Sequence, residues 1–151
     1  MSEIKVRCAI AAEASRIADY NRKMAMETES LALNESTVMA GVVALIGHPE
    51  RGFYLVAEAD GAMVGCIKVS FEWSAWRNKM FWWIGSCYVK REFRGRGVYA
   101  ALYKKAEELA ASEGNVCGFR LYAHKDDVHA QEVFRGLGMA EKEFRVFEEM
   151  F

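Results

Sequence analysis

The sequence contains few prolines and few cysteines. Pro49 is the one proline among 151 residues, and the cysteines are Cys8, Cys66, Cys87 and Cys117. They are widely spaced and form no C-x-x-C pair, so we expect neither a structural zinc site nor a disulfide framework. The three histidines have no cysteine or acidic cluster at ligand spacing beside them, so no metal is predicted.

An excess of one charge and a long hydrophobic run are also missing. Lys and Arg number 20 and Asp and Glu number 21, giving a formal net charge of −1. Non-specific binding to nucleic acid or to a membrane surface therefore has no electrostatic support. No N-terminal signal-peptide pattern and no apolar run long enough to cross a bilayer occur, so we expect a cytoplasmic protein.

The composition that remains is that of a globular protein. Hydrophobic residues make up 52% and charged residues 27% of the chain, which excludes a disordered class. A chain of 151 residues is long enough to bury a proper core, and no linker, repeat or low-complexity tract divides it. We therefore expect residues 1–151 to form a single domain.

The first two thirds of the chain predict two helices followed by an antiparallel meander. Two segments have apolar residues at helical spacing, and Asn34 or Ser36 can cap the second of them. Two β-rich runs then flank Asp60-Gly61, a dipeptide typical of a tight hairpin. In order, the expected elements are a strand over 4–10, helices over 11–28 and 34–46, and strands over 53–59, 62–71 and 80–89.

The remaining residues predict a parallel crossover. A helix over 98–114 lies between the strand 80–89 and a strand over 119–123, and such strand–helix–strand units join parallel strands. A last helix over 128–137 and a β-rich segment over 140–151 follow. The predicted fold class is α/β (mixed α+β): one sheet, antiparallel and then parallel, with helices on both faces.

The loop before the helix at 98 is the most informative stretch. Gly95 and Gly97 let backbone amides approach a ligand without an intervening Cβ, and Arg94 and Arg96 flank them. The first turn of the helix, 98–101, carries no acidic residue. Its unpaired amides and positive dipole end are thus available to an outside anion, of which phosphate is the usual one.

These residues resemble the GNAT superfamily of N-acetyltransferases. The family signature Arg/Gln-x-x-Gly-x-Gly/Ala is similar to 94–99, although Tyr99 replaces the final small residue. A second family segment, Asn-x-x-Ala followed by Tyr and Gly-Phe, lines up with Asp127 to Ala130, Phe134 and Gly138-Met139. The order of predicted elements also agrees, so the resemblance covers nearly the whole chain.

The resemblance implies acetyl-CoA as the acyl donor. It implies that the strand edge at Cys87 and Val89 pairs with the pantetheine amides, and that Asp127 and Phe134 lie along the cofactor arm. As a carboxylate, Asp127 can only accept hydrogen bonds, unlike the family's asparagine. The diphosphate would be held by the loop amides of Arg94, Gly95, Arg96, Gly97, Val98 and Tyr99.

Transfer of an acetyl group to an amine requires the neutral amine, and an alkyl ammonium has a pKa of about 10.4. The resemblance puts the acceptor pocket near carboxylates that follow the first helix (Glu27, Glu29) or lie in the meander (Glu72). We predict Glu29 or Glu72 as the base, acting directly or through one water.

The family's usual proton donor to the leaving thiolate is a tyrosine at the position of Phe134. Phenylalanine cannot donate a proton, but a thiolate leaves tolerably well without one, since its parent thiol has a pKa of about 8.5. Tyr88, Tyr99 and His129 are the alternatives, and the sequence does not choose among them. Cys87 has no local histidine to activate it, so we interpret it as a packing residue.

Aromatic residues crowd one segment, 71–83. They are typical of core or dimer packing, which makes a homodimer plausible. Trp82 and Trp83 point to opposite faces of a strand, so one of them is available to a ligand. We name Trp83 and Trp73 as candidates for the wall of the acceptor pocket.

Two other functions fit part of the pattern. Gly95-x-Gly97-x-x-Ala100 also fits a dinucleotide-binding fingerprint, but an antiparallel meander precedes it and only residues 101–151 follow. A non-catalytic acyl-CoA sensor or scaffold is favoured by Phe134 and Asp127. The acceptor, a small-molecule amine or a peptide, is not specified by the sequence.

Overall fold

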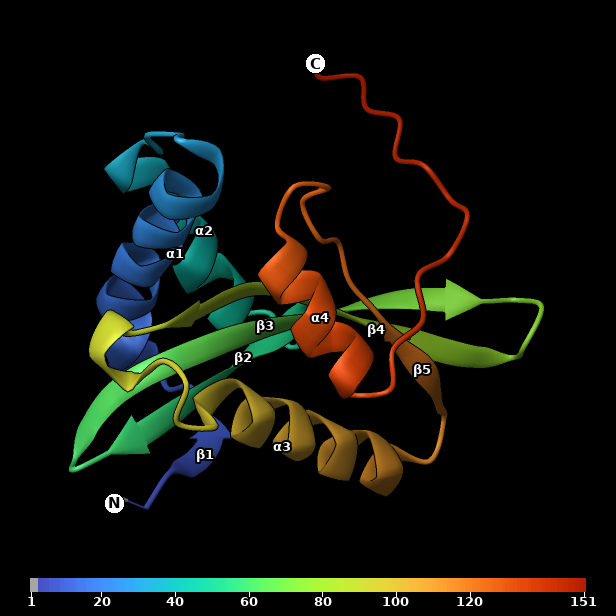
Figure 1. The fold of residues 1–151 in the computed structure, drawn as a ribbon, viewed down its shortest axis with the longest axis horizontal. Coiled ribbons are helices and arrows are strands. Elements are labelled where there is room, and N and C mark those ends of the chain that lie inside the picture. Colours follow the sequence, from blue (N-terminus) through green and yellow to red (C-terminus); the bar gives the residue numbers. More distant parts are fainter. Residues whose placement is uncertain (1–2) are drawn as a thin grey trace.

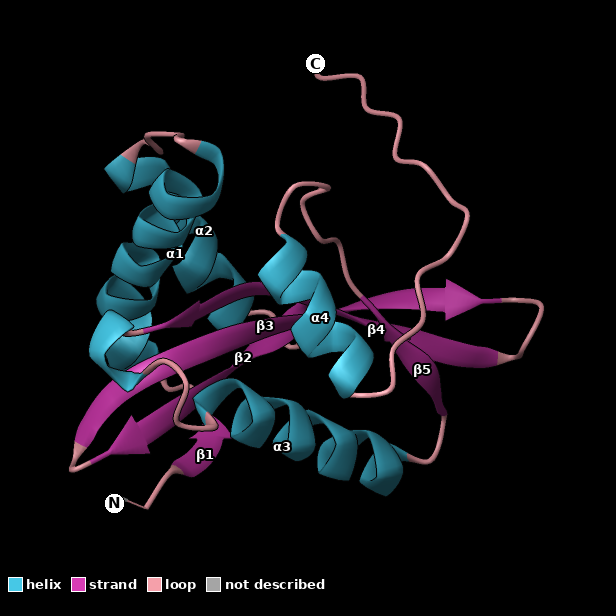
Figure 2. Ribbon diagram, in the orientation of Figure 1, coloured by secondary structure: helices cyan, strands magenta, loops and turns pink. Residues whose placement is uncertain are grey.

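The computed structural model describes residues 3–151, so the first two residues of the expected domain lie outside it. One five-stranded sheet in the order β1-β2-β3-β4-β5 forms its centre (Figures 1 and 2). The first four strands are antiparallel to their neighbours, and β4 and β5 are parallel. The elements are β1 (Lys5–Cys8), α1 (Ala14–Glu29), α2 (Glu35–Ile46), β2 (Gly52–Ala59), β3 (Ala62–Ser74), β4 (Lys79–Val89), α3 (Val98–Glu113), β5 (Val116–Arg120) and α4 (Val128–Gly136).

Helices cover both faces of the sheet, as expected. On one face Leu102 of α3 and Trp82 of β4 belong to a core that includes Leu55 and Ile67. On the other face the core contains Ile17 of α1 and Val42 of α2, together with Tyr54 of β2. Each fully buried Leu or Ile contributes roughly 1.5–3 kcal/mol, so these two layers hold the sheet in place. Among the described helices, none is both long enough and apolar enough to span a membrane.

Turn chemistry places several elements where the sequence predicts them. Asp60 and Gly61 both have positive φ, 54° and 75°, which is the geometry of the expected tight hairpin. Asn34, and not Ser36, caps α2: its side chain accepts a hydrogen bond from the Thr37 amide at 2.9 Å. A single-turn 3-10 helix at Ala11–Glu13 precedes α1, where one continuous helix was expected.

Three other boundaries differ from the prediction. β3 continues to Ser74, because cross-strand pairing with β4 carries it through the polar residues after Phe71. β5 begins at Val116 and ends at Arg120, earlier than the expected 119–123, because its register is set by β4. The prediction of a β-rich segment over 140–151 is wrong for the chain as described, since those residues form neither strand nor helix.

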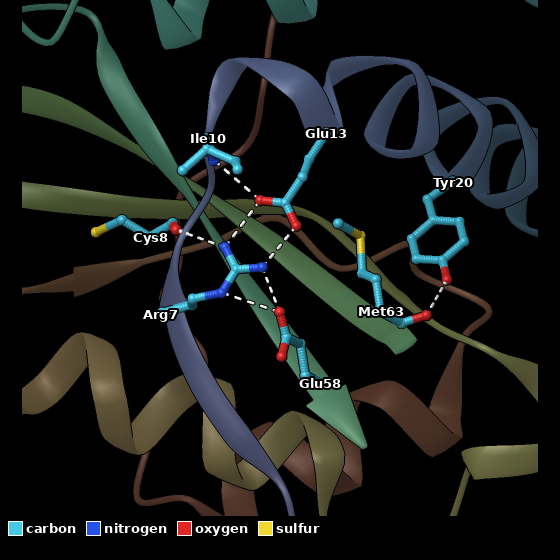
Figure 3. Close-up of polar contacts among 7 residues, drawn as sticks. All are labelled: Arg7, Cys8, Ile10, Glu13, Tyr20, Glu58 and Met63. Atoms are coloured by element: carbon cyan, nitrogen blue, oxygen red, sulfur yellow. Dashed lines mark hydrogen bonds and ion pairs between the residues drawn. The ribbon is translucent and has the colours of Figure 1, made fainter. Parts of the chain in front are cut away.

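Arg7 joins three elements through side-chain contacts (Figure 3). Its guanidinium donates to both carboxylate oxygens of Glu13, at 2.8 and 2.7 Å, and its Nε donates to Glu58 of β2 at 3.0 Å. The hydrogen bond from Arg7 is the main cause that holds the pKa of Glu13 below its usual value. In the same view the Tyr20 hydroxyl donates to the Met63 carbonyl at 2.6 Å, which fastens α1 to β3.

Candidate active site

The loop between β4 and α3 forms an open cradle of backbone amides. Gly95 and Gly97 have φ of 74° and 81°, and a Cβ at either position would meet no atom within 4 Å. The space in front of the loop is therefore open, and the backbone has the left-handed conformation that favours glycine.

The N-terminus of α3 that follows has no capping side chain. Gly97 is its N-cap, its first turn holds no acidic residue, and the bond from the Ala101 amide to the Gly97 carbonyl (3.0 Å) opens its ladder. The amides of the first helical residues are left without intrahelical partners, and the helix dipole adds positive potential there. The arrangement suits an anion with several oxygens, as a diphosphate has.

Arg94 lies at the start of this loop, but its side chain turns away from the amide row. Its Nε donates to the Val89 carbonyl at 2.8 Å, and its Nη2 donates to Glu27 of α1 at 2.7 Å. Its backbone amide is also taken, by the Arg91 carbonyl at 3.3 Å. Of the six amides predicted to hold an anion, the five from Gly95 to Tyr99 remain.

Glu27 is a partner that the sequence analysis named without a specific role. Burial is the largest single influence on its carboxyl and raises the pKa, but the hydrogen bonds and positive charges of Arg94 and Arg91 together outweigh it, so that the pKa lies below its usual value. Arg91 makes a second, longer ion pair with it at 3.4 Å. No sequence signal links residues 27 and 94, because the contact depends on how α1 lies against the loop.

The edge of β4 next to the cradle is free on one side. Pairing with β5 ends at Trp83↔Arg120, while pairing with β3 continues to Val89↔Gly65. A register shift opposite Ile67 and a positive φ of 47° at Ser86 mark a bulge that bends the strand where the two diverge. Cys87 and Val89, predicted for this edge, do lie on it. An extended chain with amide groups can add to such an edge as a further strand.

Tyr99 and Phe134 meet between α3 and α4, with ring centroids 5.9 Å apart. The Tyr99 hydroxyl is buried and has no hydrogen-bond partner among the described residues. Burial raises the pKa of this hydroxyl far above its ordinary value, so it stays protonated. It is therefore a hydrogen-bond donor that has no acceptor among the described residues. A buried hydroxyl without a partner, next to the free edge of β4, is placed to donate a hydrogen bond to a bound ligand.

Burial also raises the pKa of the Cys87 thiol strongly, so that it stays protonated. A thiol that stays neutral is a poor nucleophile, which supports the interpretation of this half-buried cysteine as a packing residue. Asp127 is the N-cap of α4: its Oδ1 accepts from the Ala130 amide at 3.1 Å. One of its two carboxylate oxygens is therefore occupied by the helix.

Glu72 is the centre of a second polar cluster, on the sheet face opposite Trp82. It accepts a hydrogen bond from Trp83 Nε1 at 2.7 Å, and Arg120 of β5 donates to both of its oxygens at 3.2 Å. The Arg120 guanidinium lies 3.7 Å from the centroid of the Phe81 ring. The cluster therefore combines a carboxylate, a cation and aromatic surface at the end of β5.

Tyr122 extends this cluster, with its ring 4.7 Å from that of Trp83. Arg120 and Tyr122 were not predicted from the sequence. In the strand expected over 119–123, Arg120 and Tyr122 are two residues apart, which was a signal that both lie on the face opposite Phe119. β5 itself ends at Arg120.

Two other predicted residues are not brought to this cluster. Trp73 follows Glu72 along β3 and therefore points to the opposite face, half exposed. Glu29 is the last residue of α1, is exposed, and makes no side-chain hydrogen bond or ion pair with any described residue. Among residues 3–151 there is likewise no group of three or more His, Cys, Asp or Glu that is placed to hold a metal ion.

Comparison with known proteins identifies the family of this chain. The model of the acetyltransferase (GNAT) family matches residues 17–139, which span α1 through α4. The chain belongs to the GNAT acetyltransferase family. A protein described as a possible acetyltransferase of Clostridium difficile 630 is 32% identical, with a TM-score of 0.91 over 98% of this chain and 97% of that one.

Two further matches, one in sequence and one in fold, cover different shares of the chains. An uncharacterized N-acetyltransferase of Methanocaldococcus jannaschii is 33% identical over 100 residues, 66% of this chain, and the matched part spans 43% of that relative's length. The fold also matches an aminoglycoside N-acetyltransferase, AAC(6')-Iy, solved in complex with CoA. That match has a TM-score of 0.76 at 17% identity and covers 99% of this chain and 96% of that one. The sheet, with one parallel pair, also differs from the successive parallel units that dinucleotide binding requires.

Proposed function

We propose that residues 1–151 form one GNAT domain that transfers the acetyl group of acetyl-CoA to an amine by direct attack on the thioester. The observation that carries the proposal is the amide cradle next to the free edge of β4. The cradle fits the diphosphate of CoA, and the strand edge fits its amide-containing pantetheine arm. The two features are neighbours in the protein, as the two groups are in CoA.

In this proposal the amides of Gly95, Arg96, Gly97, Val98 and Tyr99 bind the diphosphate. The β4 edge at Cys87 and Val89 pairs with the pantetheine amides, and Phe134 packs beside the sulfur. Asp127 contributes mainly by starting α4 at the correct place. Arg94 supports the loop from behind, through Val89 and Glu27, and is not a direct ligand of the diphosphate.

Tyr99 supplies the hydrogen-bond donor that Phe134 cannot be. Its hydroxyl is buried, protonated and without a partner, and its ring packs on Phe134. A hydrogen-bond donor aimed at the departing sulfur is most effective where charge develops in a dry site. Because burial raises the pKa of this hydroxyl, it would stabilise the thiolate through a hydrogen bond and not through full proton transfer. Of the three alternatives that the sequence left open, Tyr88, Tyr99 and His129, this one has the geometric support.

Glu72 is the better supported of the two proposed bases. The Trp83 and Arg120 contacts orient its carboxylate, whereas Glu29 has no partner to hold it. Glu72 would take the amine proton directly or through a water, and Trp83 and Tyr122 would form the wall on which the apolar part of the acceptor lies. We propose a small-molecule amine, or a peptide amine, as the acceptor.

Two further proposals concern the setting in which the domain works. All four cysteines are free in the described chain, which favours a reducing compartment such as the cytoplasm. We also propose a homodimer, for which the exposed aromatic residues of 71–83 offer apolar contact surface.

A second candidate function is a non-catalytic acyl-CoA sensor, favoured by the missing tyrosine at Phe134. The test is an amine panel with CoA release as readout, run on the wild type and on Phe134→Tyr, alongside calorimetric binding of CoA. Turnover of any amine well above hydrolysis supports the enzyme, and Phe134→Tyr should keep or raise it. Tight CoA binding without turnover on every amine would support the sensor, and absence of CoA binding would contradict both.

A further inference from the structure

Lys68 is a half-buried cation on β3, the middle strand of the sheet. Its side chain makes no hydrogen bond or ion pair with any other described residue. Lysine is rarely drawn into a protein surface without a partner, because its ammonium must be solvated or paired. No step of the acetyl transfer proposed above uses it, so its charge is left to be explained.

Lys68 shares a face of the sheet with Glu72. The two residues are four positions apart in β3, and alternate residues of a strand point to the same side. On β4 they are opposite Gly85 and Phe81, with Trp83 between these two. Four strand residues span about 13 Å, so a small molecule that lies on Trp83 can reach both Lys68 and Glu72.

The lysine side chain lies across β4 at a residue that has no side chain of its own. A Cβ added at Gly85 would be 3.6 Å from Lys68 Cε, an ordinary van der Waals contact. Gly85 directly precedes the bulge at Ser86, and the free edge at Cys87 follows. In the proposed function this is where the acceptor amine approaches the thioester, and the lysine ammonium is therefore beside it.

The charges of this face favour an acceptor that brings a negative group. The residues of 68–74 and 79–85 that face this way carry two lysines, Lys68 and Lys79, and one carboxylate, Glu72. Glu72 is already paired with Arg120 at 3.2 Å, so it does not compensate either lysine. Lys79 is exposed at the far end of β4, whereas Lys68 is half-buried next to the free edge.

We propose that Lys68 binds a carboxylate of the acceptor, and that the acceptor is an amino acid with an aromatic or large apolar side chain. The proposal rests on the acetyl-transfer function and narrows its acceptor. The carboxylate gives the half-buried ammonium its missing partner through a charge-assisted hydrogen bond. The amine then lies between Lys68 and Glu72, and the apolar side chain lies on Trp83 and Tyr122. A peptide N-terminus has no carboxylate beside its amine and is therefore a poor acceptor.

The first test is product binding, which needs no turnover. N-acetyl-L-phenylalanine has a carboxylate where N-acetyl-L-phenylalaninamide has an amide, and calorimetry measures both against the protein saturated with CoA. We expect the wild type to bind the acid at least about 10-fold more tightly, or about 1.4 kcal/mol, and Lys68→Met to lose this preference. Lys79→Met is the matched control, since it removes the other lysine of the same face, and it should keep the preference.

The second test is turnover of L-phenylalanine, L-leucine and their amides, with CoA release as readout. Lys68→Met should lower kcat/KM about 10-fold for the acids and leave it unchanged for the amides. Because each ratio compares two proteins on one substrate, differences in amine pKa between substrates cancel. Lys68→Arg keeps the charge and should retain part of the preference. Circular dichroism checks that each variant folds, and CoA affinity should be unaltered in all of them.

Several results would overturn the proposal. These are no binding of either product, equal affinity for the acid and the amide, a preference that survives Lys68→Met, or an equal loss in Lys79→Met. Weaker CoA binding in Lys68→Met would also overturn it, because the lysine would then serve the cofactor. A lack of turnover on every amine would contradict acetyl transfer, while product binding still decides whether Lys68 is a carboxylate site. The two failures are therefore distinguishable.

Discussion

Arg94 Nη2 and Glu27 Oε2 lie 2.7 Å apart and join the glycine loop to the end of α1. The same guanidinium bonds to the Val89 carbonyl and lies over the Tyr88 ring, so the arginine is fixed on three sides. The pair therefore sets the position of the cradle, and it places a negative charge behind it.

The first prediction concerns Glu27→Gln. Gln keeps the size of Glu27 but removes a negative charge near the site for the diphosphate, so we expect CoA to bind about 2- to 5-fold more tightly, with the gain reduced by salt. The exposed part of the pair is screened, so the free energy of unfolding at pH 7 should fall by only about 0.2–1 kcal/mol. Calorimetric titration with CoA and denaturant unfolding measure the two effects. Weaker CoA binding would mean that Glu27 acts mainly by ordering the loop.

The second prediction uses the two glycines that flank α3, which have the same left-handed backbone conformation. Gly97 and Gly114 have φ of 81° and 76°, and a Cβ at either meets open space. Ala at each should cost about 1 kcal/mol of stability, because both residues must hold a left-handed conformation. Only Gly97→Ala puts a methyl group in the cradle, so it should weaken CoA binding at least about 10-fold, a loss of about 1.4 kcal/mol. Equal CoA affinities in the two variants would argue against the cradle as the binding site.

The third prediction addresses Tyr99→Phe. The hydroxyl has no partner in the described chain, so its removal should leave stability unchanged or raise it by up to about 1 kcal/mol. If it donates a hydrogen bond to the leaving sulfur, kcat should fall by about 10²-fold, the lower end for a lost donor to developing charge, with CoA affinity unchanged.

Tyr103→Phe is the control for this change, because its ring is a close neighbour of Tyr99 on the same helix. It should leave kcat unaltered. Phe134→Tyr in the Tyr99→Phe background should recover part of the loss, and an undiminished kcat in Tyr99→Phe alone would remove the residue from the chemistry.

The fourth prediction concerns Glu72→Gln. The amide oxygen can still accept from Trp83, so the variant should fold, but it cannot take a proton. We expect kcat/KM for the amine to fall by about 10²–10⁴-fold at pH 7, and to recover as the pH approaches that at which the amine is neutral. Glu29→Gln should leave the pH profile unchanged. A profile that moves with Glu29 and not with Glu72 would reverse the assignment.

The fifth prediction is the pH dependence of the Arg7 contacts. The pKa of Glu13 is lowered in the folded protein, so its stabilising contribution is complete above its unfolded value and is lost as the pH falls through its folded value. Arg7→Met should therefore lower the free energy of unfolding at pH 7 by on the order of 1 kcal/mol, after allowance for the exposure of the arginine. The difference from wild type should shrink in acid below about pH 4. Denaturant unfolding at a series of pH values measures it, and a constant difference would locate the effect in packing.

Local patterns in the sequence were enough to predict most of the framework. The Asp60-Gly61 hairpin, the Asn34 cap and the helix that begins at Val98 each depend on residues that are neighbours along the chain. The open cradle is of the same kind, because glycine spacing and an uncapped helix start are local properties. Strand ends were less well predicted, since pairing with a neighbour carries β3 past Phe71 and starts β5 at Val116.

By itself, then, the sequence determined the order of elements, the family resemblance and the loop on which it rests. Tertiary structure decided the contacts between distant residues: that Arg94 turns back to Glu27, that Glu72 meets Arg120, and that the Tyr99 hydroxyl is left without a partner. It also decided that the apolar residues of 140–151 find no place on their own sheet. The physical reason is that helix caps, turns and alternation are governed by near neighbours, whereas charge pairing and burial depend on which surfaces the finished sheet brings together.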